Sequence, residues 1–504
     1  MSRQVRRRHW VRLDNASNIF PATRRDADPK VFRMSAELDH EVDPGLLQEA
    51  LDETYARFPL YHAVLRRGVF WYYLQDSELH PVVEEETLPS CAAIYQPDRR
   101  TLLFRVVHHH RRVSLEIFHA LSDGTGALWF LTDLLAGYAR RRFPEEAPPR
   151  SAAQAEARPG AAERPDPPLA AVGTHPGAQA AEEVHELTTD SFAHYFRRRR
   201  RTPEVQQDAH QEEFSREAAP AVLTVQEADE PPTEDAPLEA SAPRAPRPAR
   251  HRIHHVHGTR TPDHRTRIIE LMMPARPVLG LAKAEGVALT MYLTALFFEA
   301  IRRSDSAAHG ARSSHEGPTM AASVPVNLRQ FFPSTSARNF FATIRVEHTY
   351  GHGDDSTGAV ARGLQERFSA EATPEALEQK LQKLIRVERM PLARIVPRPV
   401  KDRLLSVINY ANNRRLTVAI SNLGRVTLPE PAESHVGRML FHVSAVRPQF
   451  CAISHAGLLT LSFTAPFVQT DHVREYAALL TEAGVEVTVS AARVSEDELL
   501  EFGT

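Results

Sequence analysis

Hydrophobic and polar positions repeat with two different periods along the first 145 residues. DPGLLQEALDETYARFP, at 43–59, repeats apolar residues every three or four positions after an Asp-Pro pair, which predicts an amphipathic helix with a capped start. TLLFRVV and VSLEIF are β-like runs on either side of the polar HHHRR, which predicts a hairpin. Strands are also expected on both sides of the helix, within 31–75.

Residues 144–250 lose this periodicity. Nearly half of the 37 prolines fall here, among Ala, Glu and Arg and with few aromatic residues. Such a segment cannot bury enough apolar surface to offset the entropy of ordering it, so we predict a mostly disordered insertion at 145–265. One island, HELTTDSFAHYFRRRRR, has aromatic residues at helical spacing and predicts a short helix at 185–200.

Helical and strand patterns return from residue 266. RTRIIELMM predicts a strand, PARPVLGLAKAEG a helix closed by Gly286, and LTMYLTALFFEAIRR an apolar helix capped by Thr290. Further along, the pattern predicts strands in MAASVPV and FFATIRVEH, helices over 356–409, three β-like runs over 416–465, and a last helix in HVREYAALLTEAGV.

These elements predict an α/β protein with mixed sheets, divided into two halves. The N-terminal half is expected at 1–144 and the C-terminal half at 266–504, with the insertion between them. At 504 residues the chain is too long for one ordinary core. Two compact halves plus unstructured sequence account for that length.

Composition and charge exclude several classes of partner and site. The formal net charge of -3 gives no electrostatic reason to expect nucleic acid or an anionic membrane as a partner. Cys91 and Cys451 provide neither a disulfide framework nor a CxxC signature, and both are expected to be core residues. No apolar run follows the basic N-terminal stretch, and none of about 18 residues occurs elsewhere, so we expect a cytoplasmic protein without a transmembrane segment.

The stretch VSLEIFHALSDGTGALWF, at 113–130, places a histidine, an aspartate and two glycines between an expected strand and an expected helix. Period-two alternation puts His119 on the buried face of the strand, and Ser122 or Asp123 is placed to cap the helix. A partly buried neutral imidazole there could take a proton from a hydroxyl or amine that attacks a carbonyl. A core histidine before an ordinary helix cap explains the pattern equally well.

FHALSDG resembles the HxxxDG motif of the chloramphenicol acetyltransferase-like superfamily, which includes condensation domains and alcohol acetyltransferases. RLDNASNIFPA, SVPVNLRQFFPS, RNFFATIRVE and ISNLG resemble segments of its bacterial alcohol acetyltransferase-like branch. The resemblance covers roughly 10–144 and 265–495. It implies two similar α/β halves that form a V with a central channel, in an enzyme that transfers an acyl group from a thioester to a hydroxyl acceptor.

The resemblance also implies roles for the residues of the motif. His119 would be the general base on the acceptor. Asp123 would be a structural residue paired with an arginine, for which Arg329 and Arg345 are the candidates. Gly124 would permit close backbone approach by substrate or by the other half.

The segment ISNLG, at 420–424, is the second part of the expected site. In related proteins Ser421 and Asn422 end a strand that faces the channel, where either could donate a hydrogen bond to the developing oxyanion. A structural role is the alternative, in which Asn422 and Gly424 make the turn before VTLPEP.

Two differences between this sequence and the motifs of other branches narrow the choice of branch within the superfamily. Condensation domains and wax-ester synthases usually carry HHxxxDG, whereas position 118 here is phenylalanine, and the DFGWG signature of plant BAHD enzymes does not occur. We therefore expect an alcohol O-acetyltransferase-like enzyme, with acyl-CoA as co-substrate, no permanently bound cofactor, and a small alcohol or amine as acceptor. An acyl carrier protein as donor in polyketide or peptide assembly, and a non-catalytic adaptor on the same fold, are the alternatives.

Three charged or histidine-rich stretches are assigned no site. HHHRR lies in the predicted hairpin turn and HRIHHVHGTRTPDH lies beside the insertion, and neither has a Cys or carboxylate set at ligand spacing, so no metal site is predicted. Five arginines at 197–201 are expected to be a solvated charge run. Their contact with the 3′-phosphate of coenzyme A is the alternative to test.

Overall fold

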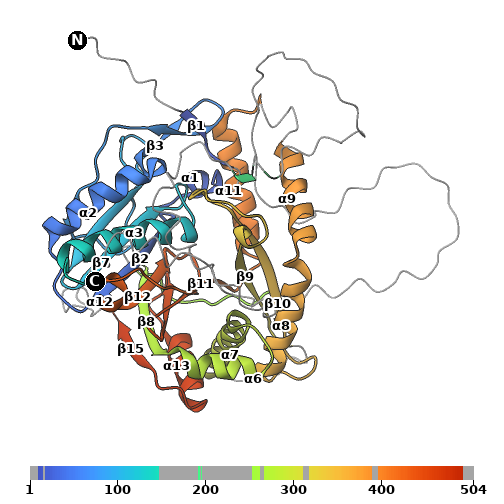
Figure 1. The fold of residues 1–504 in the computed structure, drawn as a ribbon. Helices are drawn as coiled ribbons and strands as arrows, with labels where there is room; N and C mark the ends of the chain where they lie inside the picture. Colours follow the sequence, from blue (N-terminus) through green and yellow to red (C-terminus); the bar gives the residue numbers. More distant parts are fainter. Residues whose placement is uncertain are drawn as a thin grey trace, which may run out of the picture.

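The computed structural model describes two α/β halves (Figure 1). Most of the predicted insertion at 145–265 lies outside the described residues, as do the arginine run and all but three residues of the helix predicted at 185–200. The residues that the structure describes are 10–14, 17–146, 191–192, 195, 252–261, 266–309, 317–388 and 395–491.

The N-terminal half packs two long helices on a mixed sheet with the strand order β12-β2-β7-β6-β5, and adds an antiparallel sheet of order β1-β4-β3. Only the pair β5/β6 in the larger sheet is parallel. Its elements are β1 (Trp10–Arg12), α1 (Ile19–Thr23), β2 (Val31–Leu38), α2 (Pro44–Arg57), η1 (Pro59–His62), β3 (Ala63–Arg67), β4 (Tyr72–Asp76), β5 (Val83–Glu85), β6 (Phe104–His109), β7 (Arg112–Phe118) and α3 (Gly124–Arg142).

The C-terminal half is built on a seven-stranded mixed sheet with the order β10-β9-β11-β13-β14-β8-β15. Helices α7, α8 and α13 pack around its core. The elements are β8 (Arg267–Pro274), α6 (Ala275–Ala284), α7 (Leu289–His309), β9 (Thr319–Asn327), η2 (Leu328–Gln330), β10 (Phe341–Thr349), α8 (Thr357–Glu371), α9 (Pro374–Glu388), α11 (Arg398–Asn413), β11 (Val418–Arg425), α12 (Ala432–His435), β12 (Val436–Val443), β13 (Gln449–His455), β14 (Leu458–Ala465), α13 (Asp471–Glu482) and β15 (Thr488–Ala491).

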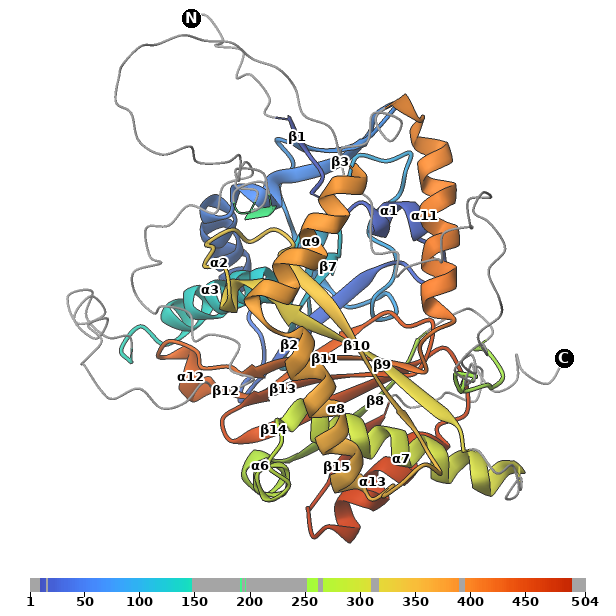
Figure 2. The same cartoon turned by 90° about the vertical axis from the view of Figure 1, so that its right-hand side faces the viewer.

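The C-terminal segment also enters the N-terminal half at two places. Strand β12 pairs antiparallel with β2 and forms the edge of the N-terminal sheet. Helix α11 packs on α1, and Figure 2 shows the two side by side. The two halves are therefore joined through shared structure as well as through the chain between them.

Most of the predicted elements are confirmed, including the start of α2. The Asp43 carboxylate accepts hydrogen bonds from the backbone N–H groups of Gly45 and Leu46, at 2.9 and 3.1 Å, and Pro44 occupies the first turn. The polar HHHRR turn joins β6 to β7, as predicted. Gly286 follows α6 with a φ of +69°, the left-handed conformation expected of a helix-ending glycine.

Two details of the C-terminal half differ from the prediction. Thr290 lies inside α7, which begins at Leu289, and its hydroxyl accepts a hydrogen bond from Asn422 of β11, so it is not the cap. The helix α13 is not the last element, because β15 follows it and pairs with β8. The side chains of β15 are exposed, so its sequence lacks the buried alternation that marks a strand.

Among the described helices, none is by itself long and apolar enough to cross a membrane. Helices α6 and α7 reach that length and hydropathy only as a pair, and the pair is bent by 88°.

Candidate active site

The turn between β7 and α3 carries the HxxxDG motif. Strand β7 ends at Phe118, and the backbone N–H of His119 donates to the carbonyl of Lys30, at 2.8 Å, just before β2. Asp123 caps α3, because its carboxylate accepts from the backbone N–H of Gly126 at 2.9 Å. Asp123 is therefore the cap, and the Ser122 hydroxyl donates instead to the carbonyl of Ala337 at 2.6 Å.

Aromatic rings from both halves surround the imidazole of His119. Phe20 of α1 stacks on it, with ring centroids 4.2 Å apart and planes 8° apart. Phe32 of β2 lies edge-on at 4.9 Å, and Phe341 at the start of β10 lies at 5.8 Å. These rings replace water around the imidazole and fix its plane.

Burial lowers the pKa of His119 below its ordinary value of 6.5, although its own backbone carbonyl, Asp123 and Asn339 act in the opposite direction. The neutral imidazole therefore predominates at pH 7. Nδ1 is buried and makes no hydrogen bond of ordinary geometry within the described part of the chain. The side chain as a whole is only partly buried. Of the two ring nitrogens, Nε2 is therefore the candidate for a contact with substrate.

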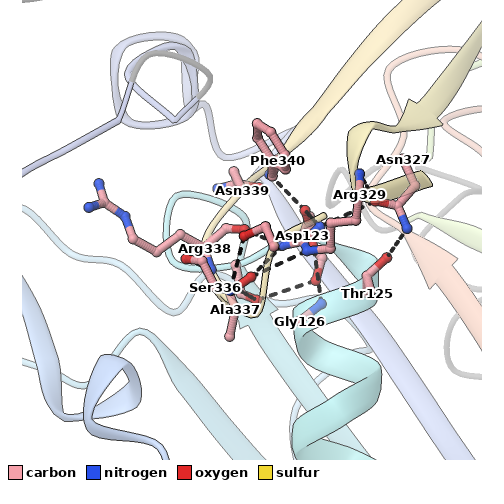
Figure 3. Close-up of polar contacts among 12 residues, drawn as sticks. Asp123, Thr125, Gly126, Asn327, Arg329, Ser336, Ala337, Arg338, Asn339 and Phe340 are labelled. Carbon is pink, nitrogen blue, oxygen red and sulfur yellow. Dashed lines mark hydrogen bonds and ion pairs between the residues drawn. The ribbon is translucent and has the colours of Figure 1, made fainter. Parts of the chain in front are cut away.

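Asp123 joins the two halves through a buried ion pair (Figure 3). One carboxylate oxygen accepts from Nη1 of Arg329 at 2.7 Å and from the backbone N–H of Phe340 at 2.8 Å, while the other caps α3. The side chains of Asp123 and Arg329 are 7% and 6% exposed. Asp123 is fully occupied by these contacts, which fit a structural role.

Arg329 is the arginine that the structure brings to Asp123. Its guanidinium also donates to the carbonyls of Ser336 and Arg338, at 2.7 and 2.6 Å, and lies over the ring of Trp129. Arg345, the other predicted partner, does not reach Asp123. It lies on β10, where it pairs with Glu347 and donates to the carbonyl of Arg415.

Gly124 of the motif and Gly126, two residues after it, lie against the C-terminal half. A Cβ atom at Gly124 would lie 2.8 Å from Cδ2 of Leu423 on β11. A Cβ atom at Gly126 would lie 2.2 Å from the carbonyl oxygen of Ala337 and 2.4 Å from Oγ of Ser122. Gly126 is therefore the more demanding position, because a backbone carbonyl of the other half occupies the space.

Asn339 connects the motif to the N-terminal segment and was not predicted as a site residue. Its side-chain amide nitrogen donates to the carbonyl of His119 and to Oγ of Ser17, both at 2.7 Å. Its neighbour Arg338 forms a buried ion pair with Asp14 at 3.3 Å. The segments RLDNASNIFPA and RNFFATIRVE thus meet beside His119.

Ser421 and Asn422 lie on β11, next to the motif. Leu423 belongs to the core of the N-terminal half and Ile420 to that of the C-terminal half, so alternation places Ser421 on the face that meets Gly124. Ser421 makes no side-chain hydrogen bond to a described residue. The Asn422 amide donates to Oγ1 of Thr290 at 2.9 Å and accepts from the N–H of Gly424 at 2.8 Å.

Phe118 occupies the position at which an HHxxxDG motif has its first histidine. Its side chain is fully buried and stacks on Tyr95, with ring centroids 5.2 Å apart. Cys91 and Cys451 are likewise buried, and burial raises the pKa of both thiols. These three side chains fill the core, as expected for the cysteines.

Two small cavities lie elsewhere in the described part of the chain. One is lined by residues at and just before the start of β4 and by residues of α11, including Trp71 and Lys401, and the other by residues around Arg33 and Glu116. Neither includes His119. The channel that the resemblance implies is therefore not one of these two cavities.

No family model and no curated protein matches the chain in sequence. Solved structures match it along nearly its whole length. TRI3 trichothecene 15-O-acetyltransferase from Fusarium sporotrichioides gives a TM-score of 0.54 at 9% identity, over 96% of this chain and 96% of that chain. The fold of the chain is therefore similar to that of this acetyltransferase.

Two further structures give the same result. Polyketide synthase associated protein 5 from Mycobacterium tuberculosis matches with a TM-score of 0.51 at 11% identity, over 93% of this chain and 96% of that chain. TRI101 from F. graminearum, solved with ethyl coenzyme A, matches with a TM-score of 0.51 at 9% identity, over 95% and 99%. The chain therefore shares its overall fold with these three structures, which agrees with the mixed α/β fold that the resemblance of the motif implied.

Proposed function

We propose that the protein is an acyltransferase that moves an acyl group from a thioester to a hydroxyl acceptor, with His119 as the general base. The observation that supports this most directly is the state of the His119 ring. It lies at the junction of the two halves, stacked on Phe20 and close to Phe341, and burial lowers its pKa, so it is an unprotonated base at neutral pH.

In the proposed reaction, Nε2 of His119 accepts the hydroxyl proton as the acceptor oxygen attacks the thioester carbonyl. The tetrahedral intermediate then collapses, the carbon–sulfur bond breaks, and the imidazolium returns its proton to the departing thiolate. The products are an ester and a free thiol, and no acyl-enzyme forms. An amine acceptor would react in the same way and give an amide.

Ser421 is the better candidate for stabilising the oxyanion. Its hydroxyl makes no hydrogen bond to a described residue, and it lies on the face of β11 that meets Gly124. Asn422 uses both ends of its amide in contacts to Thr290 and Gly424, so we assign it to the turn. A Ser421→Ala variant is expected to lower kcat more than Asn422→Ala does, provided both remain folded.

We assign Asp123 a structural role. Its carboxylate is committed to Arg329, Phe340 and Gly126, which fixes the turn that carries His119 and attaches it to the C-terminal half. It is a positioning residue, and it takes no proton in the proposed reaction.

We propose acyl-CoA as the thioester donor, by likeness of fold to TRI101, whose structure was solved with ethyl coenzyme A. A thioester on an acyl carrier protein is the second candidate, favoured by likeness of fold to a polyketide synthase associated protein. Both donors present the same thioester to the same base.

A thiol-release assay tests the proposal. The purified full-length protein is incubated with a panel of acyl-CoA donors or acylated carrier proteins, and with alcohols and amines as acceptors. We expect acceptor-dependent thiol release with at least one donor class, together with an ester or amide product detected by mass spectrometry. Binding of partners without turnover of any thioester would instead favour a non-catalytic adaptor.

A further inference from the structure

A cluster of histidine and carboxylate side chains lies at the opposite end of β2 from His119. Asp39 and His40 follow β2, and His435 is the last residue of α12. Nδ1 of His40 lies 2.6 Å from one carboxylate oxygen of Asp39, and Nδ1 of His435 lies 2.9 Å from the other. One donor atom from each residue lies within 4.8 Å of the other two.

The second ring nitrogen of each imidazole, Nε2, also has a polar partner. Nε2 of His40 lies 3.1 Å from the hydroxyl oxygen of Tyr138, and Nε2 of His435 lies 3.0 Å from a carboxylate oxygen of Glu146. Phe143 stacks on His435, with ring centroids 3.6 Å apart. Histidines that bind metals usually hydrogen-bond their second nitrogen to a carboxylate or another polar group, which fixes the ring.

The donor set suits a transition metal. Two imidazole nitrogens and one carboxylate are ligands that Zn²⁺ accepts, at about 2.0–2.2 Å each, so donors in a tetrahedral site lie about 3.4 Å apart. The observed separations of 2.6 and 2.9 Å, and the limit of 4.8 Å, need only small side-chain rotations to reach that value. An ion-pair network without a metal is the alternative for the same contacts.

We propose that Asp39, His40 and His435 form a site for a divalent transition metal such as Zn²⁺, with water in the remaining position. Glu146 and Tyr138 hold the two histidine rings without binding the ion. This site is independent of the proposed acyl transfer, and none of its residues belongs to the HxxxDG turn.

The site would join the two parts of the chain. The backbone N–H of Asp39 already donates to the carbonyl of His435 at 3.1 Å, and α12 leads directly into β12. A bound ion would therefore fasten the loop after β2 to the start of the strand that the C-terminal segment adds to the N-terminal sheet. We expect the ion to stabilise the fold rather than to take part in catalysis.

Zinc titration of the metal-depleted full-length protein tests the proposal. We expect one tight site per chain by calorimetry, with micromolar or lower Kd, and a rise in Tm when Zn²⁺ is added. His435→Ala and His40→Gln should each weaken binding by at least about tenfold, and Glu146→Gln by about tenfold because it frees one ring. Using two ligand variants guards against one of them failing to fold.

Two control variants separate this site from the other histidines of the chain. His110 lies on the exposed β6–β7 turn beside Glu41, and His255 and His257 lie together in the segment before β8. His110→Ala and the double variant His255→Ala/His257→Ala should leave the tight site unchanged. The proposal is overturned if the full-length protein shows no saturable zinc binding, or if His435→Ala binds zinc as tightly as the unaltered chain.

Discussion

At the scale of single residues, the buried ion pair between Asp123 and Arg329 holds the turn of the candidate site against the C-terminal half. Asp123→Asn removes the charge opposite a buried guanidinium, and breaking such a pair costs about 3–5 kcal/mol. Chemical denaturation should show a loss of that size. The exposed pair of Arg303 and Glu482 is the control, because Glu482→Gln should cost less than about 1 kcal/mol. Equal losses in the two variants would contradict a structural role for Asp123.

The pKa of His119 makes a second prediction at this scale. Because burial lowers that pKa below 6.5, the base stays unprotonated as the pH falls through 6.5. The acid limb of kcat/KM against pH should therefore have its midpoint below 6.5. The structure would be contradicted by an acid-limb midpoint above 6.5 that shifts when His119 is replaced, because a buried imidazole titrates below that pH.

Sequence reasoning reached some residues of the site and not others. The motif identified His119 and Asp123, because strand alternation and helix capping are local properties. It could not choose between Arg329 and Arg345, since that choice depends on how η2 and β10 approach α3. The aromatic rings of Phe20 and Phe341 were missed for the same reason, although the segments that contain them had been singled out.

At the scale of elements, the start of α3 depends on close packing against the backbone of the C-terminal half. Gly126→Ala would place a methyl group 2.2 Å from the carbonyl oxygen of Ala337, so α3 and that segment must separate. We expect a loss of stability of about 1–3 kcal/mol. Gly280→Ala in the exposed part of α6 meets no atom within 4 Å and should stabilise the protein slightly. Thermal unfolding of both variants provides the comparison, and a neutral Gly126→Ala would contradict the observed packing.

The elements themselves were largely predictable, and their partners were not. The sequence pattern was sufficient to predict the helix start at Asp43, the helix end at Gly286 and the hairpin turn, because each of them depends only on neighbouring residues. Thr290 was predicted as a helix cap, but it lies within α7, where its hydroxyl accepts a hydrogen bond from Asn422. Nothing in the sequence of β12 indicates that it leaves its own half, because pairing with β2 is a long-range contact.

At the scale of the whole molecule, buried histidines make stability depend on pH. Burial lowers the pKa of His442 on β12 to about 3 and that of His472 on α13 to about 4. In the unfolded chain both titrate near 6.5. Below pH 6.5 the unfolded state therefore binds more protons at these residues, and the stability they contribute, complete above that pH, is lost as the pH falls toward 3.

Urea denaturation at several pH values between 7 and 4.5 measures this effect. We expect the free energy of unfolding to decrease with falling pH, and the decrease to be smaller in a His472→Leu variant. In the metal-free protein His435 acts in the opposite sense: against the effect of its burial, Asp39 and Glu146 raise its pKa, so its contribution is lost as the pH rises. A free energy of unfolding that rises steadily from pH 7 to pH 4.5 would contradict the assignment of His442 and His472 as buried neutral groups.

The central claim, that His119 is the base of an acyltransferase, is tested most directly by the rate of thiol release in a His119→Ala variant. A general base typically contributes 10²- to 10⁴-fold, so we predict a decrease of at least about a hundredfold in kcat with the Tm retained. The exposed His110→Ala serves as the matched control and should keep full activity. A folded His119→Ala protein that retains more than about a tenth of the activity would contradict the claim.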